Sequence, residues 1–234
     1  MNKKISLNNN QLKIIAMVAM FIDHIGKAFF PQVAILTIIG RISFPIFAFM
    51  IAEGCTYTKN RKKYLGMIAG MAIILQFANY TITKSLEMSV FVVFSLSIIT
   101  IFSMDTLIKS KSVMHKLFMI FPLALVIFCS FIAPTLFKSL NFYIVYGFVG
   151  ILFPVAIYFA PSKKAKIAVA VLMVILLAVA TGYRHQWWAL LSIPLLALYS
   201  GKRGKAKLKY LFYIFYPLQR IIIFVIAYII ANIK

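Results

Sequence analysis

The chain alternates between long apolar runs and short clusters of Lys and Arg. An apolar run of about 20 residues is what an α-helix needs to cross the hydrocarbon core of a bilayer. With 63% hydrophobic and 12% charged residues, the composition is that of a membrane protein and not of a soluble domain. We therefore expect an all-α fold, a polytopic bundle of transmembrane helices integral to the cytoplasmic membrane.

The apolar runs between basic clusters predict about nine membrane spans. No connecting segment is long enough to fold alone, so residues 1–234 are expected to form a single transmembrane domain. Both cysteines lie in apolar runs, so neither a disulfide nor a metal site is expected. The predicted spans are 12–30, 33–57, 64–83, 88–108, 117–137, 141–160, 165–182, 186–200 and 209–232.

The basic residues fall mainly in alternate connecting segments, and this asymmetry predicts an orientation. Loops rich in Lys and Arg stay on the cytoplasmic side, so the amino terminus is expected inside and the carboxyl terminus outside. A net charge of +21 on a soluble chain would suggest nucleic acid, but here the charge is divided among short loops, and no nucleic-acid partner is expected. The basic segments are 3–13, 59–63, 109–116, 163–166 and 202–209.

Several charged or titratable residues lie inside predicted spans, where a charge costs roughly 2.5–3.5 kcal/mol and usually faces the protein interior. The chain has only four acidic residues and three histidines, yet Asp23 and His24 stand side by side in the first span. In the predicted orientation this pair lies in the outer half of the membrane. Arg41 and Arg220 reach a similar depth, whereas Glu53 lies about 18 Å closer to the cytoplasm than Arg41.

Helical geometry separates the roles of Asp23 and His24, because adjacent residues point about 100° apart on a helix. Asp23 is expected to pair with Arg41 or Lys27, which leaves His24 to face a cavity. Pro45 cannot donate to the carbonyl of Arg41, so the second span is expected to be irregular there. The alternative explanation is that Asp23 and Arg41 form an ion pair that only fixes helix packing.

The two remaining acidic residues, Glu87 and Asp105, lie near the ends of predicted helices. A carboxylate at a helix end can reach water or the membrane interface without crossing the hydrocarbon core. Both residues are therefore expected to be solvated or to extend along the helix to the membrane interface.

Both ends of the chain carry motifs of a known family. The motifs are LKIIAMVAMFIDHIG (12–26), GRISFPIFAFMIAEG (40–54), TKNRKKYL (58–65), YSGKRG (199–204) and YLFYIFYPLQR (210–220). In order and spacing they resemble the TraX family of membrane acetyltransferases, named for the enzyme that acetylates the amino terminus of conjugative pilin. The resemblance covers about the first 65 and the last 50 residues, and the middle is similar only as generic helices.

The resemblance implies an integral membrane acetyltransferase that uses acetyl-CoA and no metal. His24 suits the general base or a transient acetyl carrier, with Arg41 and Arg220 as electrostatic stabilisers and Asp23 holding Arg41. The family usually reads Tyr-Pro-Leu-His in the last helix, and Gln219 stands here instead, so a role at this position is one of positioning. Lys13 and His24 also resemble the Arg/Lys-x10-His pattern of acyltransferase-3 enzymes. Further pocket candidates are Glu53, Gln219, Tyr216 and His185.

Two functions remain open at this point. The first is acetyl transfer to an amine or hydroxyl of an exported or membrane-embedded acceptor, such as a pilin, another peptide or a surface glycan. The alternative is a proton-coupled transporter that uses Asp23, His24 and Glu53, although no internal repeat favours it. In the enzyme, Glu53 either lines the donor path or pairs with a basic loop residue. The cations expected to meet the phosphates of acetyl-CoA are Lys13, Lys59, Arg61, Lys62, Lys63, Lys202 and Arg203.

Overall fold

The computed structural model describes residues 6–204 and 208–233, and these residues are mostly helical. The chain divides into two compact units, here called unit 1 (residues 1–50 and 167–234) and unit 2 (residues 51–166). Helices α3 (Ser43–Tyr57) and α9 (Lys163–Thr181) each continue from one unit into the other. The single domain over 1–234 stays a prediction. Among the residues used for the orientation, Lys3, Lys4, Lys205, Lys207 and Lys234 lie outside the described residues.

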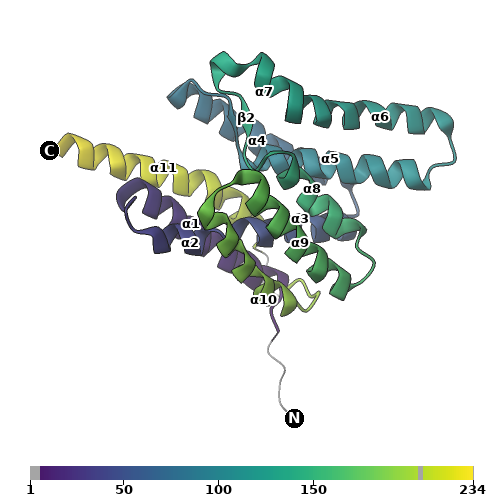
Figure 1. The fold of residues 1–234 in the computed structure, drawn as a ribbon, viewed down its shortest axis with the longest axis horizontal. Coiled ribbons are helices and arrows are strands. Elements are labelled where there is room, and N and C mark those ends of the chain that lie inside the picture. Colours follow the sequence, from purple (N-terminus) through teal and green to yellow (C-terminus); the bar gives the residue numbers. More distant parts are fainter. Residues whose placement is uncertain (1–5, 205–207, 234) are drawn as a thin grey trace, which may run out of the picture. The chain divides into compact units, whose positions relative to one another are not determined.

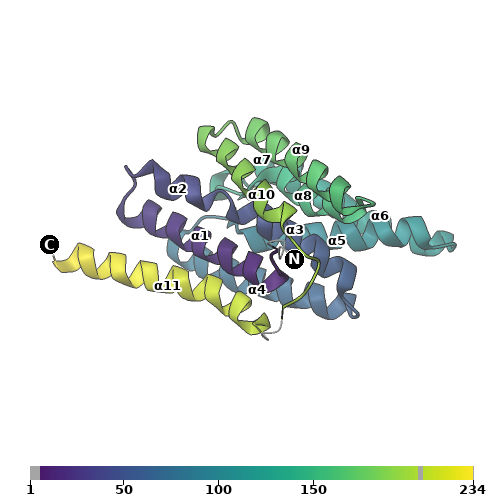
Figure 2. The same ribbon diagram turned by 90° about the horizontal axis from the view of Figure 1, so that it is seen from below.

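Unit 1 is organised around α1 (Asn9–Phe29), which lies beside α2 (Ala34–Gly40) and α11 (Lys209–Ile233) (Figures 1 and 2). Helix α1 begins with a capping box. The Asn8 side chain accepts a hydrogen bond from the Gln11 N–H at 3.0 Å, and the Gln11 side chain accepts one from the Asn8 N–H at 2.9 Å. The remaining elements of unit 1 are the 3₁₀ helix η3 (Arg184–Leu191) and α10 (Ser192–Ala197).

The second predicted span is interrupted where Pro45 indicated. Helix α2 ends at Gly40, residues 41 and 42 form a turn, and α3 begins at Ser43. The Ser43 hydroxyl donates to the Gly40 carbonyl at 2.8 Å and so satisfies one acceptor at the break. The expected irregularity is confirmed, and it places Arg41 at a corner between two helices.

Unit 2 is centred on α5 (Val90–Lys109), which packs against α4 (Arg61–Thr83), α6 (Val113–Ile127) and α8 (Gly147–Phe159) (Figure 1). The buried Ser97 hydroxyl donates to the Ile151 carbonyl at 2.8 Å, which ties α5 to α8. The remaining elements are the π-helix η1 (Phe128–Ile132), α7 (Ala133–Leu136), the 3₁₀ helix η2 (Lys138–Leu140) and two parallel strands, β1 (Glu87–Met88) and β2 (Tyr143–Ile144).

Five helical stretches among the described residues are long and apolar enough to cross a membrane. They are Ala34–Tyr57, Arg61–Thr83, Val90–Lys109, Val113–Leu136 and Lys163–Thr181, and each matches a predicted span. The all-α fold is therefore confirmed, whereas the count of nine spans and the orientation stay predictions.

One predicted span is wrong as a single helix. Residues 186–200 form the end of η3, the short helix α10 and a bridge at Tyr199. Trp187 and Trp188 point outward from η3, with 45% and 47% of their surface exposed. A 3₁₀ helix tightens the turn and cannot extend far, so this segment lacks a continuous helix of spanning length.

Candidate functional site

His24 lies where α1 meets α11. Its ring contacts the Tyr216 ring edge-on, with centroids 6.1 Å apart and planes at 78°. The charged side chains close enough to interact electrostatically with the imidazole are Arg220, Asp23 and Lys27. The Nδ1 atom of His24 is buried and has no hydrogen-bond partner among the described residues. A ligand at this position could therefore bind the imidazole nitrogen without displacing a protein contact.

The residues of α11 that face His24 follow helical spacing. Tyr216 and Arg220 stand four residues apart, and the Arg220 guanidinium lies 5.9 Å from the centroid of the Tyr216 ring. Gln219 is only 2% exposed and close enough for its amide to act on His24. Neither amide atom of Gln219 forms a hydrogen bond of good geometry in the described part of the chain, although His24 lies beside the amide. A buried amide without hydrogen bonds has lost those it made to water and gained none in return. A bound polar ligand would supply the missing hydrogen bonds.

Asp23 pairs with Lys27, four residues along α1, at 2.6 Å. Arg41 and Lys27 were the two expected partners of Asp23, and the structure shows the pair with Lys27. The expectation that Asp23 holds Arg41 is therefore wrong. Lys27 stands one helical turn from Asp23, whereas the Arg41 guanidinium lies over the Tyr183 ring. Helix α2 also approaches closely, since a Cβ on Gly40 would lie 2.2 Å from the Asp23 Cβ. The backbone of α2 thus occupies the space beside Asp23, and its buried Oδ1 has no described partner.

Arg41 lies over the aromatic ring of Tyr183, the residue that precedes η3. Its guanidinium is 4.8 Å from the centroid of Tyr183, and the Tyr183 ring contacts His185 edge-on at 5.4 Å. The Nε atom of Arg41 is buried and lacks a hydrogen-bond partner among the described residues. The structure thus joins Arg41 and His185 through Tyr183, and it joins His24, Tyr216, Gln219 and Arg220 at the contact of α1 with α11.

Gln186 on η3 was missed by the sequence analysis. It is 2% exposed, and its Nε2 has no partner in the residues described. The available signal was a polar residue at the start of the predicted span 186–200, but its neighbours in RHQWW are those of a membrane interface. Gln186 belongs to the same class as Gln219, a buried amide with unsatisfied hydrogen-bonding capacity.

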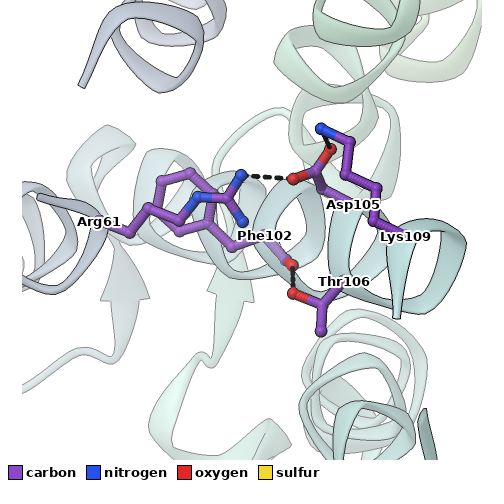
Figure 3. Close-up of polar contacts among 5 residues, drawn as sticks. All are labelled: Arg61, Phe102, Asp105, Thr106 and Lys109. Atoms are coloured by element: carbon purple, nitrogen blue, oxygen red, sulfur yellow. Dashed lines mark hydrogen bonds and ion pairs between the residues drawn. The ribbon is translucent and has the colours of Figure 1, made fainter. Parts of the chain in front are cut away.

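The buried carboxylates of unit 2 have strong partners. Glu53 is 4% exposed and pairs with Lys166 at 2.5 Å, so it has a basic partner, but that partner lies in the first turn of α9 and not in a loop. Asp105 forms ion pairs with Arg61 and with Lys109, the latter at 2.7 Å (Figure 3). The expectation that Asp105 is solvated is wrong, because the start of α4 packs against the end of α5 and brings Arg61 onto it.

Glu87 is exposed, as expected for a residue at a helix end. It pairs in register with Tyr143 across the two short strands. The Tyr143 hydroxyl donates a hydrogen bond to the Glu87 carboxylate.

The cations proposed for the donor divide between the two units. Lys13, Lys202 and Arg203 belong to unit 1, and the last two are exposed. In unit 2 Arg61 is bound by Asp105 and lies 4.8 Å from the centroid of Phe102, so its guanidinium is already occupied (Figure 3). The exposed cations beside Arg61 are Lys59, Lys62 and Lys63.

Within the described residues no three His, Cys, Asp or Glu side chains come together as a metal site.

A family model described as TraX protein matches residues 8–227 of the chain. The chain belongs to the TraX family. It is similar to a probable fimbrial assembly protein FimC, serogroup H1, of Dichelobacter nodosus, with 32% identity over 80 residues, which are 32% of this chain and 33% of that protein. It is also similar to the uncharacterized protein RP591 of Rickettsia prowazekii (strain Madrid E), with 53% identity over 38 residues.

The second match covers 16% of this chain and 15% of the relative. The aligned parts therefore span about one third or less of these curated relatives. No solved structure matches the chain.

Proposed function

We propose that this TraX-family membrane protein transfers an acetyl group from acetyl-CoA to an amine or hydroxyl of an exported or membrane-embedded acceptor. The observation that carries the proposal is the set of buried polar atoms without described partners in unit 1, contributed by α1, η3, α11 and the turn after α2. The family membership supports the reaction class. The similarity to a fimbrial assembly protein supports a pilin or related peptide as the acceptor.

In the proposed reaction, His24 removes a proton from the acceptor as its nitrogen or oxygen attacks the thioester carbonyl carbon. A C–N or C–O bond forms, the C–S bond breaks, and the CoA thiolate takes the proton from the imidazolium. An imidazole suits both steps because its unperturbed pKa is near 6.5. A transient acetyl group on His24 is the alternative route to the same products.

The polar residues of unit 1 have separate proposed roles. Arg220 and Arg41 stabilise the oxyanion that develops on the thioester carbonyl, as fixed positive charges do in acyl transfer. Gln219 and Gln186 position the acceptor through their unsatisfied amides. Asp23, bound to Lys27, balances the positive charge near the imidazole without contacting the acceptor.

The donor is proposed to reach the site from the cytoplasmic side. In unit 1 its phosphates meet Lys13, Lys202 and Arg203, because guanidinium and ammonium groups bind phosphate through charge-assisted hydrogen bonds. In unit 2 the exposed residues Lys59, Lys62 and Lys63 are proposed separately as a surface that attracts anions. Arg61 is left out of this group because Asp105 already binds it.

The transporter remains the second candidate, and one observation weighs against it. A proton path through Glu53 needs a carboxylate that is open to the path, whereas Glu53 is 4% exposed and bound to Lys166 at 2.5 Å. We therefore place Glu53 among the residues that hold the fold of unit 2.

The test is label transfer in liposomes that contain the full chain. Acetyl-labelled CoA is added on one side, with peptides that carry free or blocked amino termini, sugars and lipids as acceptors. We expect label on an unblocked acceptor with wild type, a loss of about 100-fold or more with His24→Ala, and wild-type transfer with His115→Ala, an exposed histidine on α6. Equal transfer by wild type and His24→Ala removes His24 from its role. Proton-driven uptake without any acyl transfer favours the transporter.

A further inference from the structure

The two segments that join α4 to α5 and α7 to α8 line an open pocket of unit 2 (Figure 1). Leu86 N–H donates to the Leu140 carbonyl at 2.8 Å, and β1 pairs with β2, so the segments are held side by side. The pocket measures about 430 Å³. Its lining residues include Ser85, Glu87, Lys138, Asn141 and Tyr143.

Left-handed backbone conformations gather around this pocket. Lys84, Asn141 and Tyr146 have φ of 54°, 50° and 65°, and in the described chain they are the residues other than glycine with positive φ. The conformation is unfavourable for lysine and tyrosine, so the surrounding contacts must hold it. The two segments therefore have a defined shape, and the pocket is part of the folded unit.

Glu87 differs from the other acidic residues of the chain. Asp23, Glu53 and Asp105 each form an ion pair with Lys or Arg. The Glu87 carboxylate is exposed and accepts a hydrogen bond from the Tyr143 hydroxyl, and it has no ion pair within the residues that the structure describes. In a chain with 25 Lys and Arg residues, this carboxylate is left open to a cation from outside.

Lys138 supplies the opposite charge in the same pocket. Its side chain is exposed, and it forms neither a hydrogen bond nor an ion pair with a described residue, Glu87 included. A carboxylate and an ammonium that line one pocket without pairing complement a ligand that carries both an ammonium and an anionic group. A ligand with a single charge would be attracted by one of them and repelled by the other.

The pocket lies where three candidate membrane-spanning stretches end. Pocket residues follow Arg61–Thr83 and Val113–Leu136 by two residues and precede Val90–Lys109 by three. Stretches of this length cross the hydrocarbon core, so their ends lie at the level of the lipid headgroups. Exposed apolar side chains adjoin the pocket residues in sequence, at Leu136, Phe137 and Leu140.

We propose that this pocket binds the headgroup of a zwitterionic phospholipid with a primary ammonium, the ethanolamine class. The Glu87 carboxylate, positioned by Tyr143, accepts hydrogen bonds from the ammonium, and Lys138 donates to the phosphate. The exposed apolar side chains beside the pocket contact the acyl chains. A quaternary ammonium has no N–H to donate, so a choline headgroup is a poorer ligand. Lipid binding here is independent of the acetyl transfer proposed above.

The test measures lipid retention by the full chain, purified in a neutral detergent and titrated with labelled phosphatidylethanolamine. Glu87→Gln and Lys138→Gln are compared with Lys111→Gln, an exposed lysine beyond the far end of α5. We expect each pocket variant to weaken retention about tenfold and the control to change it less than about twofold. Both pocket variants should keep the wild-type thermal midpoint, because the strands pair through their backbones.

The choice of lipid tests the role of Glu87. Phosphatidylcholine should bind wild type more weakly than phosphatidylethanolamine and should lose less than about threefold in Glu87→Gln. The charge-retaining variant Glu87→Asp should hold phosphatidylethanolamine better than Glu87→Gln does. Equal retention of the two lipids by wild type would overturn the assignment to a primary ammonium.

Competition separates the sources of the same two charges. The competitors are glycerophosphoethanolamine, which is the soluble headgroup, and a peptide with a free amino terminus and a carboxylate. Tight lipid retention with only weak displacement by either competitor supports the lipid. Displacement by the peptide at lower concentration than the lipid, lost in both pocket variants, assigns the pocket to a peptide and overturns the proposal. Equal retention of phosphatidylethanolamine by wild type, Glu87→Gln and Lys138→Gln overturns the site itself.

Discussion

Units 1 and 2 both bury charged side chains, but they compensate them differently. In unit 2, Asp105 binds two cations and Glu53 binds one. The described buried atoms without partners in that unit belong to Gln76 and Ser89, which carry no charge. In unit 1 such atoms belong to charged or titratable residues as well as amides, namely Asp23, His24, Arg41, Gln186 and Gln219.

This difference indicates which charges hold the fold and which are available to a ligand. A buried ion pair with both partners present is satisfied, and removing one partner is costly. A buried polar group without a partner has lost its hydration on folding, and this cost already lowers the stability of the folded state. Substitutions in unit 2 should therefore change stability, and substitutions in unit 1 should change activity.

Arg41 and Arg61 give the sharpest comparison, because each guanidinium lies 4.8 Å from an aromatic centroid and only Arg61 has a carboxylate partner. Arg41→Gln should lower kcat/KM for acetyl transfer about 100-fold while leaving membrane insertion and the thermal midpoint unchanged. Arg61→Gln should lower the thermal midpoint while kcat/KM per folded molecule changes less than about threefold. Loss of folding in Arg41→Gln would instead make Arg41 a structural residue.

Asp105 and Asp23 compare two buried carboxylates by the same isosteric change. Asp105→Asn should lower the free energy of unfolding by about 2 kcal/mol, because Arg61 and Lys109 lose their shared partner. Asp23→Asn should lower it by less than about 1 kcal/mol, since the Lys27 side chain is half exposed. Denaturant titration in detergent measures both, and equal losses would remove the distinction between the units.

Gln219→Leu should separate stability from activity within unit 1. Replacing a buried amide that lacks described partners by an apolar side chain of similar size should raise the free energy of unfolding by about 1 kcal/mol. Acetyl transfer should fall about tenfold, because the amide no longer positions the acceptor. A loss of stability would show that Gln219 has a structural hydrogen bond after all.

Glu53→Gln should have little effect on the reaction. Transfer per folded molecule should stay within about twofold of wild type, while the thermal midpoint falls because Lys166 is left without its carboxylate. Transfer rates and thermal unfolding can be followed on the same preparation. Loss of a coupled proton flux in this variant, with stability unchanged, would support the transporter.

The sequence predicted those features that local chemistry determines. Apolar length predicted the long helices, Pro45 predicted the break beside Arg41, and helical geometry separated Asp23 from His24. The environment of Asp105 could not be predicted, because its partner Arg61 lies 44 residues earlier in the chain. The pair of Glu53 and Lys166 spans 113 residues and likewise arises from packing.

The sequence singled out the charged residues of the candidate site together with Tyr216 and Gln219, and it missed Gln186. Charges inside apolar spans are conspicuous in a sequence, and they identified His24, Arg41 and Arg220. An amide such as Gln186 is less costly to bury and gives no comparable signal. The close approach of Gly40 to Asp23 and the position of Arg41 over Tyr183 depend on the path of the backbone and could not be predicted.

The most direct test is single-turnover transfer of a labelled acetyl group by equal amounts of folded wild type, His24→Gln and Asp105→Asn. The contrast between the units predicts that His24→Gln loses about 100-fold or more in rate with its unfolding free energy unchanged. Asp105→Asn should transfer at the wild-type rate per folded molecule despite its lower stability. Wild-type transfer by His24→Gln, or a loss of transfer by Asp105→Asn beyond its loss of folded protein, would contradict this account.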